Sequence, residues 1–131
     1  MLACDVRVVG ADATMGLTET SLGIIPGAGG TQRLPRLIGA SKAKELIFTA
    51  RRLDALRALE MGMVNAVVGA GQAEEAALSM AGDIAARGPL AVRAAKLAID
   101  QGLIQADAEG GMSIERKMYG RVLGTKDRNE G

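Results

Sequence analysis

The sequence predicts an α/β fold in which residues 1–71 mix strands and helices and residues 72–131 are wholly helical. Short runs rich in β-branched residues at 5–9 and 63–68 are typical of strands, whereas apolar side chains after residue 72 recur at helical spacing. Hydrophobic residues make up 48% of the chain and aromatic residues only 2%. An alanine-rich, aromatic-poor composition favours closely packed helices over a β-sandwich. We therefore expect one domain without an internal boundary.

Two short strands are expected at the start of the chain. Asp5–Val9 alternates polar and apolar side chains, with no earlier segment for it to pair with, and Thr14–Leu17 follows after a turn at Gly10–Asp12. The next element is a helix over Gly30–Leu37. Pro35 lies inside this helix, but late enough in a short helix that it can mark a bend instead of an end.

Two further helices and a strand complete the mixed part. Ser41 is a good N-cap for a helix over Lys42–Ala50, and a helix over Ala55–Met61 should end at Gly62. Met63–Val68 is predicted as a strand. The apolar side chains on one face of the first of these helices belong to Ala43, Leu46, Ile47 and Ala50. Ordinary packing against a core is sufficient to explain that face.

The remaining sequence is predicted to be helical. The expected helices cover Ala73–Arg87, Leu90–Gln101 and a stretch from Ala106 or Met112 to Leu123. The last of them places Met112, Ile114, Met118 and Val122 near one stripe. Methionine in such a stripe is typical of a core or a subunit contact and not of a ligand site.

Charge and composition exclude several classes of function. The formal net charge is +1, from 16 basic and 15 acidic residues, so no overall field attracts nucleic acid or an anionic membrane. A single cysteine, Cys4, and the absence of histidine exclude an internal disulfide, a multi-cysteine zinc site and a histidine-dependent triad. We therefore expect no metal.

No stretch reaches the length of about 18 apolar residues that a membrane helix needs. No basic N-terminus leads into an apolar segment in the manner of a signal peptide. These two features predict a soluble protein in a reducing, intracellular compartment, with no membrane partner.

Glu19 precedes a dense cluster of glycines, and this pairing is the strongest candidate for a functional site. Gly27, Gly29 and Gly30 open the predicted helix, with Thr31 near its start. The first N–H groups of a helix can hold an oxygen or a water, while a nearby carboxyl group moves a proton on a carbonyl compound. Alternatively, the glycines only make a tight turn and Glu19 is a solvated surface acid. Spacing does not decide between the two.

Two phosphate-binding motifs do not fit the glycine cluster. A P-loop ends in Gly-Lys-Ser/Thr, but Gly30 is followed directly by Thr31. A dinucleotide fingerprint that starts at Gly27 needs a third glycine where Gln32 stands. Both nucleotide interpretations therefore fail.

Longer segments of the chain resemble a known family. Leu-Ala-Cys-Asp at Leu2–Asp5, Met-Gly-Leu-Thr-Glu at Met15–Glu19 and Ile-Ile-Pro-Gly-Ala-Gly-Gly-Thr-Gln-Arg-Leu-Pro-Arg from Ile24 resemble the middle of an enoyl-CoA hydratase of the crotonase superfamily. Lys-Glu-Leu-Ile-Phe-Thr-Ala-Arg from Lys44 and Ala-Lys-Leu-Ala-Ile-Asp-Gln-Gly from Ala95 are most similar to the methylglutaconyl-CoA hydratase branch. The resemblance covers essentially the whole chain.

The resemblance implies a crotonase-like (ClpP/crotonase) fold, of which residues 1–131 are a partial, C-terminal domain. Residues 1–71 would be the end of the β-β-α spiral core, and residues 72–131 the helical trimerisation region. It further implies a homo-oligomer, a trimer or hexamer in the family. The expected location is the cytoplasm for a bacterial protein, or the mitochondrial matrix for a eukaryotic one.

The resemblance also assigns chemistry to the candidate site. In this family, water adds syn across a 2-enoyl-CoA thioester, here with 3-methylglutaconyl-CoA as one candidate, and two backbone N–H groups hold the thioester oxygen. Glu19 matches the acid that protonates the α-carbon, and Gly27 matches the position whose N–H helps hold the reacting water. Coenzyme A is part of the substrate, and no separate cofactor is expected.

The chain departs from the family pattern at both ends. The family's other glutamate lies in a Gly-Gly-Gly-x-Glu-Leu segment just before the residues matched by Ala3–Asp5, so it would lie upstream of Met1, as would the oxyanion donors. In the family, a segment like Thr125–Gly131 is followed by a further helix. We therefore expect a C-terminal fragment that is inactive by itself.

Two alternatives to a hydratase follow from the same residues. One is a non-catalytic fragment that oligomerises through its helices. The other, implied by the resemblance to the methylglutaconyl-CoA hydratase branch, one member of which is also an RNA binder, is an RNA-binding hydratase homologue. The residues that such binding would use form a basic run of Arg33, Arg36, Lys42, Lys44, Arg51 and Arg52. Almost no aromatic side chain interleaves this run, so solvated helix faces explain it better and we do not expect nucleic acid to bind.

Overall fold

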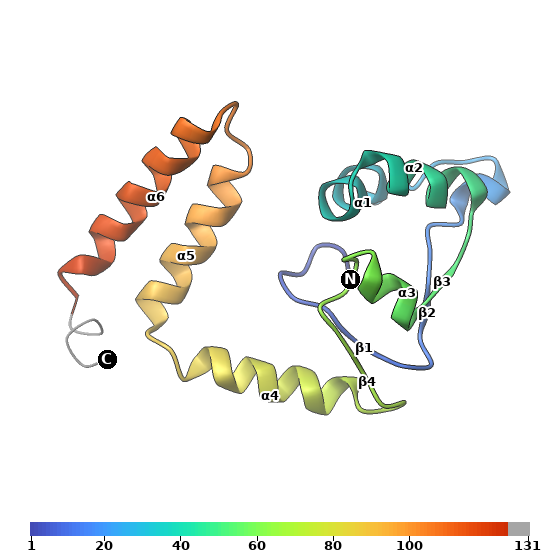
Figure 1. The fold of residues 1–131 in the computed structure, drawn as a ribbon, viewed down its shortest axis with the longest axis horizontal. Coiled ribbons are helices and arrows are strands. Elements are labelled where there is room, and N and C mark those ends of the chain that lie inside the picture. Colours follow the sequence, from blue (N-terminus) through green and yellow to red (C-terminus); the bar gives the residue numbers. More distant parts are fainter. Residues whose placement is uncertain (126–131) are drawn as a thin grey trace. The chain divides into compact units, whose positions relative to one another are not determined.

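The computed structural model describes residues 1–125, which form two compact units (Figure 1). The first unit comprises Met1–Leu78 and the second begins at Ser79. The charged end of the chain, from residue 126 onward, lies outside the described residues. The first unit is mixed α/β, and the described part of the second is helical.

The strands of the first unit are short and form two separate pairs. β1 (Val8–Gly10) pairs in parallel with β4 (Ala66–Val68). β2 (Thr14–Met15) pairs antiparallel with β3 (Leu53–Asp54). The first strand therefore has a partner, which lies far downstream in the sequence and not before it.

Both strands of the parallel pair begin later than predicted, at Val8 instead of Asp5 and at Ala66 instead of Met63. Ahead of β1, the Arg7 N–H donates to Asn65 Oδ1 at 2.9 Å, and the Arg7 carbonyl accepts from the Asn65 N–H at 2.8 Å. The Asn65 side chain thus takes the place of a backbone carbonyl as the acceptor for the Arg7 N–H, so the regular strand ladder begins only after this point. Met63 is held by a bond from its N–H to the Ala58 carbonyl, so it continues the turn after a helix.

Four helical segments lie wholly within the first unit: the 3₁₀ helix η1 (Glu19–Leu22), α1 (Gly30–Ile38), α2 (Ala40–Thr49) and α3 (Ala55–Glu60). The helix predicted through a proline is confirmed, because α1 continues past Pro35. The prediction that Ser41 caps the next helix is wrong. Gly39, with φ of +84°, ends α1 and occupies the N-cap position of α2, a backbone conformation that favours glycine.

The core of the first unit consists of aliphatic side chains from these helices and strands. Its best-buried large side chain is Leu34 of α1, which is 1% exposed. The other buried members of this cluster are Ile38, Ala43, Leu46, Ile47, Leu53, Ala58, Met63 and Val64. The predicted apolar face of α2 is thus buried at Ala43, Leu46 and Ile47, where it packs in the core.

Three longer helices follow: α4 (Ala73–Ala85), α5 (Pro89–Gly102) and α6 (Ala108–Leu123). The boundary between the units falls within α4. α5 and α6 pack side by side as a helical hairpin, shown from yellow-orange to red in Figure 1. No helix among residues 1–125 is long and apolar enough to cross a membrane.

Candidate active site

A cavity of about 350 Å³ lies in the first unit. Its wall is formed by the N-terminal segment, the residues after β2, the start of η1, the turn before α1, and Met63. The lining residues that bear on chemistry are Leu17, Glu19, Pro26, Gly29, Gly30 and Arg33. The predicted carboxylate and two of the three predicted glycines are therefore brought together at one cavity.

Glu19 is placed by the start of η1. Gly23, with φ of +73°, ends this short helix, and the Ile24 N–H donates to the Glu19 carbonyl at 3.2 Å. The hydroxyl of Thr20 donates to the Ile47 carbonyl, which fastens η1 to the end of α2. The backbone that carries the Glu19 carboxylate is therefore fixed from both sides.

One oxygen of the Glu19 carboxylate is a buried hydrogen-bond acceptor that is not satisfied. The Oε2 atom is buried and has no hydrogen-bond partner among residues 1–125. A buried polar atom without a partner is costly, and in native proteins such atoms are uncommon. Glu19 lines the cavity, so its carboxylate is placed to meet a bound molecule that presents a hydrogen-bond donor.

The turn before α1 presents backbone N–H groups at the same cavity. Gly29 is the N-cap of α1 with φ of +90°, and it supplies no side-chain cap. Its carbonyl accepts from the Gln32 and Arg33 N–H groups at 3.1 and 2.9 Å. The first amides of the helix, at Gly30 and Thr31, have no acceptor within the helix, and this end of the helix favours negative charge.

Glycine is required at position 30 for reasons of space. A Cβ atom at Gly30 would lie 2.7 Å from Pro26 Cβ and 2.8 Å from Leu17 Cδ1. The turn thus packs directly on Leu17, which lines the cavity beside Glu19. By contrast, a Cβ atom at Gly27 would meet only the Ile25 carbonyl, at 3.9 Å. Gly27 is exposed and does not line the cavity, so its role in holding water stays a prediction.

Sequence reasoning did not single out Arg33 as a cavity residue. Arg33 lines the cavity, and its Nη1 donates to the Ala28 carbonyl at 2.8 Å, across the turn. Residues three apart on a helix share a face, so the position of Arg33 after Gly30 could have indicated this placement. Leu2, Ala3 and Met63 also line the cavity and were not predicted to do so.

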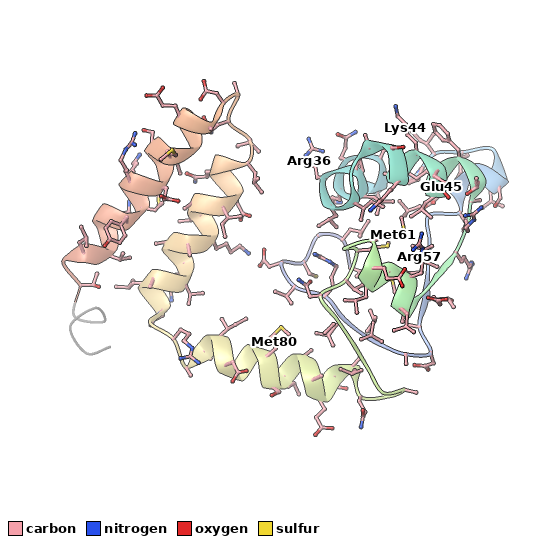
Figure 2. All side chains as sticks on the ribbon, in the orientation of Figure 1. Arg36, Lys44, Glu45, Arg57, Met61 and Met80 are labelled. Carbon is pink, nitrogen blue, oxygen red and sulfur yellow. The ribbon has the colours of Figure 1, made fainter. Side chains whose placement is uncertain are left out.

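The basic run engages local partners in the first unit. Arg51 forms an ion pair with Glu45 at 3.0 Å, and Arg36 donates to the Gln32 carbonyl at 2.7 Å. Arg36 and Lys44, which are labelled in Figure 2, are exposed on α1 and α2. These contacts are those of solvated helix faces.

Within residues 1–125, no group of three or more cysteine, aspartate or glutamate side chains could hold a metal ion. The groups at the cavity that can take part in chemistry are the Glu19 carboxylate, the amides of the turn and the Arg33 guanidinium.

Comparison with known proteins assigns this chain and its fold to a family. The model of the enoyl-CoA hydratase/isomerase family matches residues 1–131, and the chain belongs to this family. Its fold is the C-terminal part of a crotonase-like α/β fold, as predicted.

A solved enoyl-CoA hydratase from Bacillus anthracis is 55% identical, with a TM-score of 0.95, and the match covers 99% of this chain and 50% of that one. Among curated relatives, "Probable enoyl-CoA hydratase 2, mitochondrial" from Arabidopsis thaliana is 53% identical over 99% of this chain and 43% of its own length. Human mitochondrial methylglutaconyl-CoA hydratase is 52% identical over 99% of this chain and 39% of its own length. The chain thus spans about half the length of the relatives it matches, which come from bacteria and from mitochondria.

Proposed function

We propose that this protein takes part in the syn hydration of a 2-enoyl-CoA thioester, with Glu19 as the group that protonates the α-carbon. The observation that carries the proposal is the buried, unpartnered Oε2 of Glu19, at a cavity that also receives the N-terminus of α1. This cavity pairs a proton-carrying group with N–H groups that can hold an oxygen or a water.

The proposed chemistry follows from where charge develops. When water adds at the β-carbon, electrons move into the thioester and its oxygen gains negative charge, which fixed backbone amides stabilise. The resulting enolate then takes a proton at the α-carbon, and Glu19 supplies it. In this proposal the N–H of Gly27 holds the water, and coenzyme A enters as part of the substrate with no separate cofactor.

The acyl group is proposed from the relatives. Methylglutaconyl-CoA hydratases of human and mouse are each 52% identical to this chain, which supports 3-methylglutaconyl-CoA, an intermediate of branched-chain amino acid degradation, as a candidate. A straight-chain enoyl-CoA of fatty acid metabolism is the other candidate, since relatives named only as enoyl-CoA hydratases are equally similar. The proposed location is the bacterial cytoplasm or the mitochondrial matrix.

Hydration also needs a group that activates the water, and Glu19 is the one carboxylate among the described residues that line the cavity. The solved relative is about twice as long as this chain. We therefore propose that the full activity requires a further segment upstream, and that residues 1–131 by themselves turn over negligibly. A lost oxyanion donor alone typically costs about 2.7–4 kcal/mol of transition-state stabilisation.

The test is the loss of enoyl-thioester absorbance with crotonyl-CoA and 3-methylglutaconyl-CoA. It is run on this chain and on a form extended upstream to the length of the relatives. The extended form should turn over, and its Glu19→Gln variant should lose about 10²–10⁴-fold in rate. Glu75→Gln, at an exposed acid of α4, is the matched control and should retain the rate. Full activity in Glu19→Gln would contradict the proposal.

A homo-oligomer, a trimer or hexamer, is proposed for the same protein. Its support is the apolar side chains at the turn between α5 and α6, where Leu103 is 81% and Ile104 is 76% exposed. Exposed apolar patches of this kind typically mark contact sites. Sedimentation velocity should report an assembly that Leu103→Asp weakens. A monomer at all concentrations would contradict this part of the proposal.

A further inference from the structure

Arg7 is a buried charge that the proposed chemistry does not use. It is 8% exposed and is the one buried charged residue among residues 1–125. Charged side chains are almost never buried unless their donors are satisfied, because removing a charge from water is costly. A plain apolar side chain would fill the same space at lower cost. The guanidinium group therefore calls for an explanation beyond packing.

The side-chain N–H groups of Arg7 donate hydrogen bonds to two segments that are far apart in the sequence. Its Nε donates to the Met63 carbonyl at 2.8 Å, and its Nη1 donates to the Cys4 carbonyl. Cys4 belongs to the N-terminal turn, in which the Cys4 N–H donates to the Met1 carbonyl at 3.0 Å. One side chain thus joins the N-terminal turn to the segment that leads into β4.

Both of these segments form the wall of the cavity. Leu2 and Ala3, between the two ends of the N-terminal turn, line it, and so does Met63. Arg7 itself lies outside the lining, so it would act on the site through these residues and not through contact with a substrate.

We propose that Arg7 is a positioning residue of the site, which fixes the cavity wall of Leu2, Ala3 and Met63 relative to Glu19. The inference rests on the proposed hydratase function and deepens it. Arginine suits this role because its planar fork presents several donors in fixed directions, whereas lysine presents one flexible ammonium group. A lysine at this position would reach one of the two carbonyls.

The backbone around Arg7 is held independently of its side chain. The Arg7 N–H donates to Asn65 Oδ1, and the Arg7 carbonyl accepts from the Asn65 N–H. Substituting the side chain should therefore leave β1 and β4 paired while the wall loosens. This separation makes the inference testable.

The experiment compares Arg7→Met and Arg7→Lys with a core variant, Leu46→Ala, in the form extended to the length of the relatives. Leu46 is 3% exposed and does not line the cavity, so its variant controls for lost stability. We expect Arg7→Met to lower kcat for crotonyl-CoA by about 10²-fold, the size typical of a misplacement near 1 Å, with a smaller change in KM. Arg7→Lys should recover part of kcat, and Leu46→Ala should retain it.

The inference is overturned if Arg7→Met and Leu46→Ala, compared at equal loss of thermal stability, retain the same kcat. If Arg7→Met does not fold, Arg7→Lys against Leu46→Ala decides by the same criterion. Absence of turnover in the wild-type extended form would overturn the hydratase proposal and this inference together. If the wild-type extended form turns over normally and the Arg7 variants retain its kcat, only the role of Arg7 is overturned.

A second measurement needs no turnover. In the chain of residues 1–131, the methyl NMR signals of Ala3 and Met63 should shift and broaden in Arg7→Lys, while the signal of Ala43 in α2 should stay unchanged. Unchanged signals at Ala3 and Met63 would contradict the inference.

Discussion

The two units of this protein bury their apolar side chains to very different degrees. In the first unit, Leu34 and Leu46 are 1% and 3% exposed and belong to a continuous core. In the second, Leu97 and Ile99 are 40% and 60% exposed, although they lie on a regular helix. α5 contributes no buried residue, and α6 contributes only Met118.

This difference shows that sequence signals for a helix and burial of its apolar side chains are separate properties. α5 and α6 are longer than the helices that lie wholly in the first unit, and α6 has a side-chain N-cap as α3 has, so local sequence signals mark both helices. What they lack is apolar surface removed from water, which supplies most of the stability of a folded domain. The cavity with Glu19 lies in the unit that has a core, where a fixed backbone can hold a carboxylate in place.

The sharpest test of this comparison is the cost of removing one leucine from each unit. Leu34→Ala should lower the free energy of unfolding by about 2–5 kcal/mol, because it leaves a cavity in the core. Leu97→Ala should lower it less, by about 1 kcal/mol, because Leu97 is 40% exposed and packs only partly beside α6. Denaturant unfolding of the two variants measures both. Equal losses would show that α5 is covered in solution.

Replacing one glycine by alanine in each unit should change stability by less, and in opposite directions. Gly30→Ala should destabilise the first unit by about 1–3 kcal/mol, because its Cβ would overlap Pro26 and Leu17. Gly120 lies within α6, and an added Cβ there would meet no atom within 4 Å beyond its chain neighbours and the adjacent backbone of its own helix, so Gly120→Ala should stabilise the helix by about 0.5–1 kcal/mol. Thermal unfolding followed by circular dichroism measures both. A stabilising Gly30→Ala would refute the tight packing of the turn.

The smallest difference between the two units is expected at their helix caps. Asp54 caps α3 by accepting from the Arg57 N–H at 2.7 Å, and Asp107 caps α6 by accepting from the Gly110 N–H at 2.8 Å. Asp54→Ala and Asp107→Ala should each cost about 1 kcal/mol, the usual value of an N-cap. Hydrogen exchange of the first-turn amides reports each helix separately. A clear inequality would mean that the units differ in local structure as well as in burial.

Much of the fold was predictable because it depends on local signals. The helix over Gly30–Ile38 and the three late helices follow from apolar spacing, glycine breaks and the proline at position 89. The N-cap of α2 was mispredicted because the chain uses the positive φ of Gly39 and not the side chain of Ser41. The pairing of β1 with β4 could not be predicted, since it joins segments far apart in the sequence.

The candidate site was predictable to a similar extent. Glu19 and the glycines that follow it stood out, and the structure brings Glu19, Gly29 and Gly30 to one cavity. The contributions of Leu2, Met63 and Arg7 depend on tertiary contacts across the unit, which leave no pattern in a single sequence. The exposure of the second unit was equally invisible, because an amphipathic helix has the same spacing whether or not its apolar face is covered.

The most direct test of the proposed role of Glu19 is proton exchange at the α-carbon of the product, 3-hydroxybutyryl-CoA, in deuterated water. The measurement uses mass spectrometry on the form extended to the length of the relatives, for the wild type and Glu19→Gln. We expect the wild type to incorporate deuterium at the α-carbon and Glu19→Gln not to do so, while Glu75→Gln behaves as the wild type. Incorporation by Glu19→Gln at the wild-type rate would contradict the assignment of Glu19 as the group that protonates this carbon.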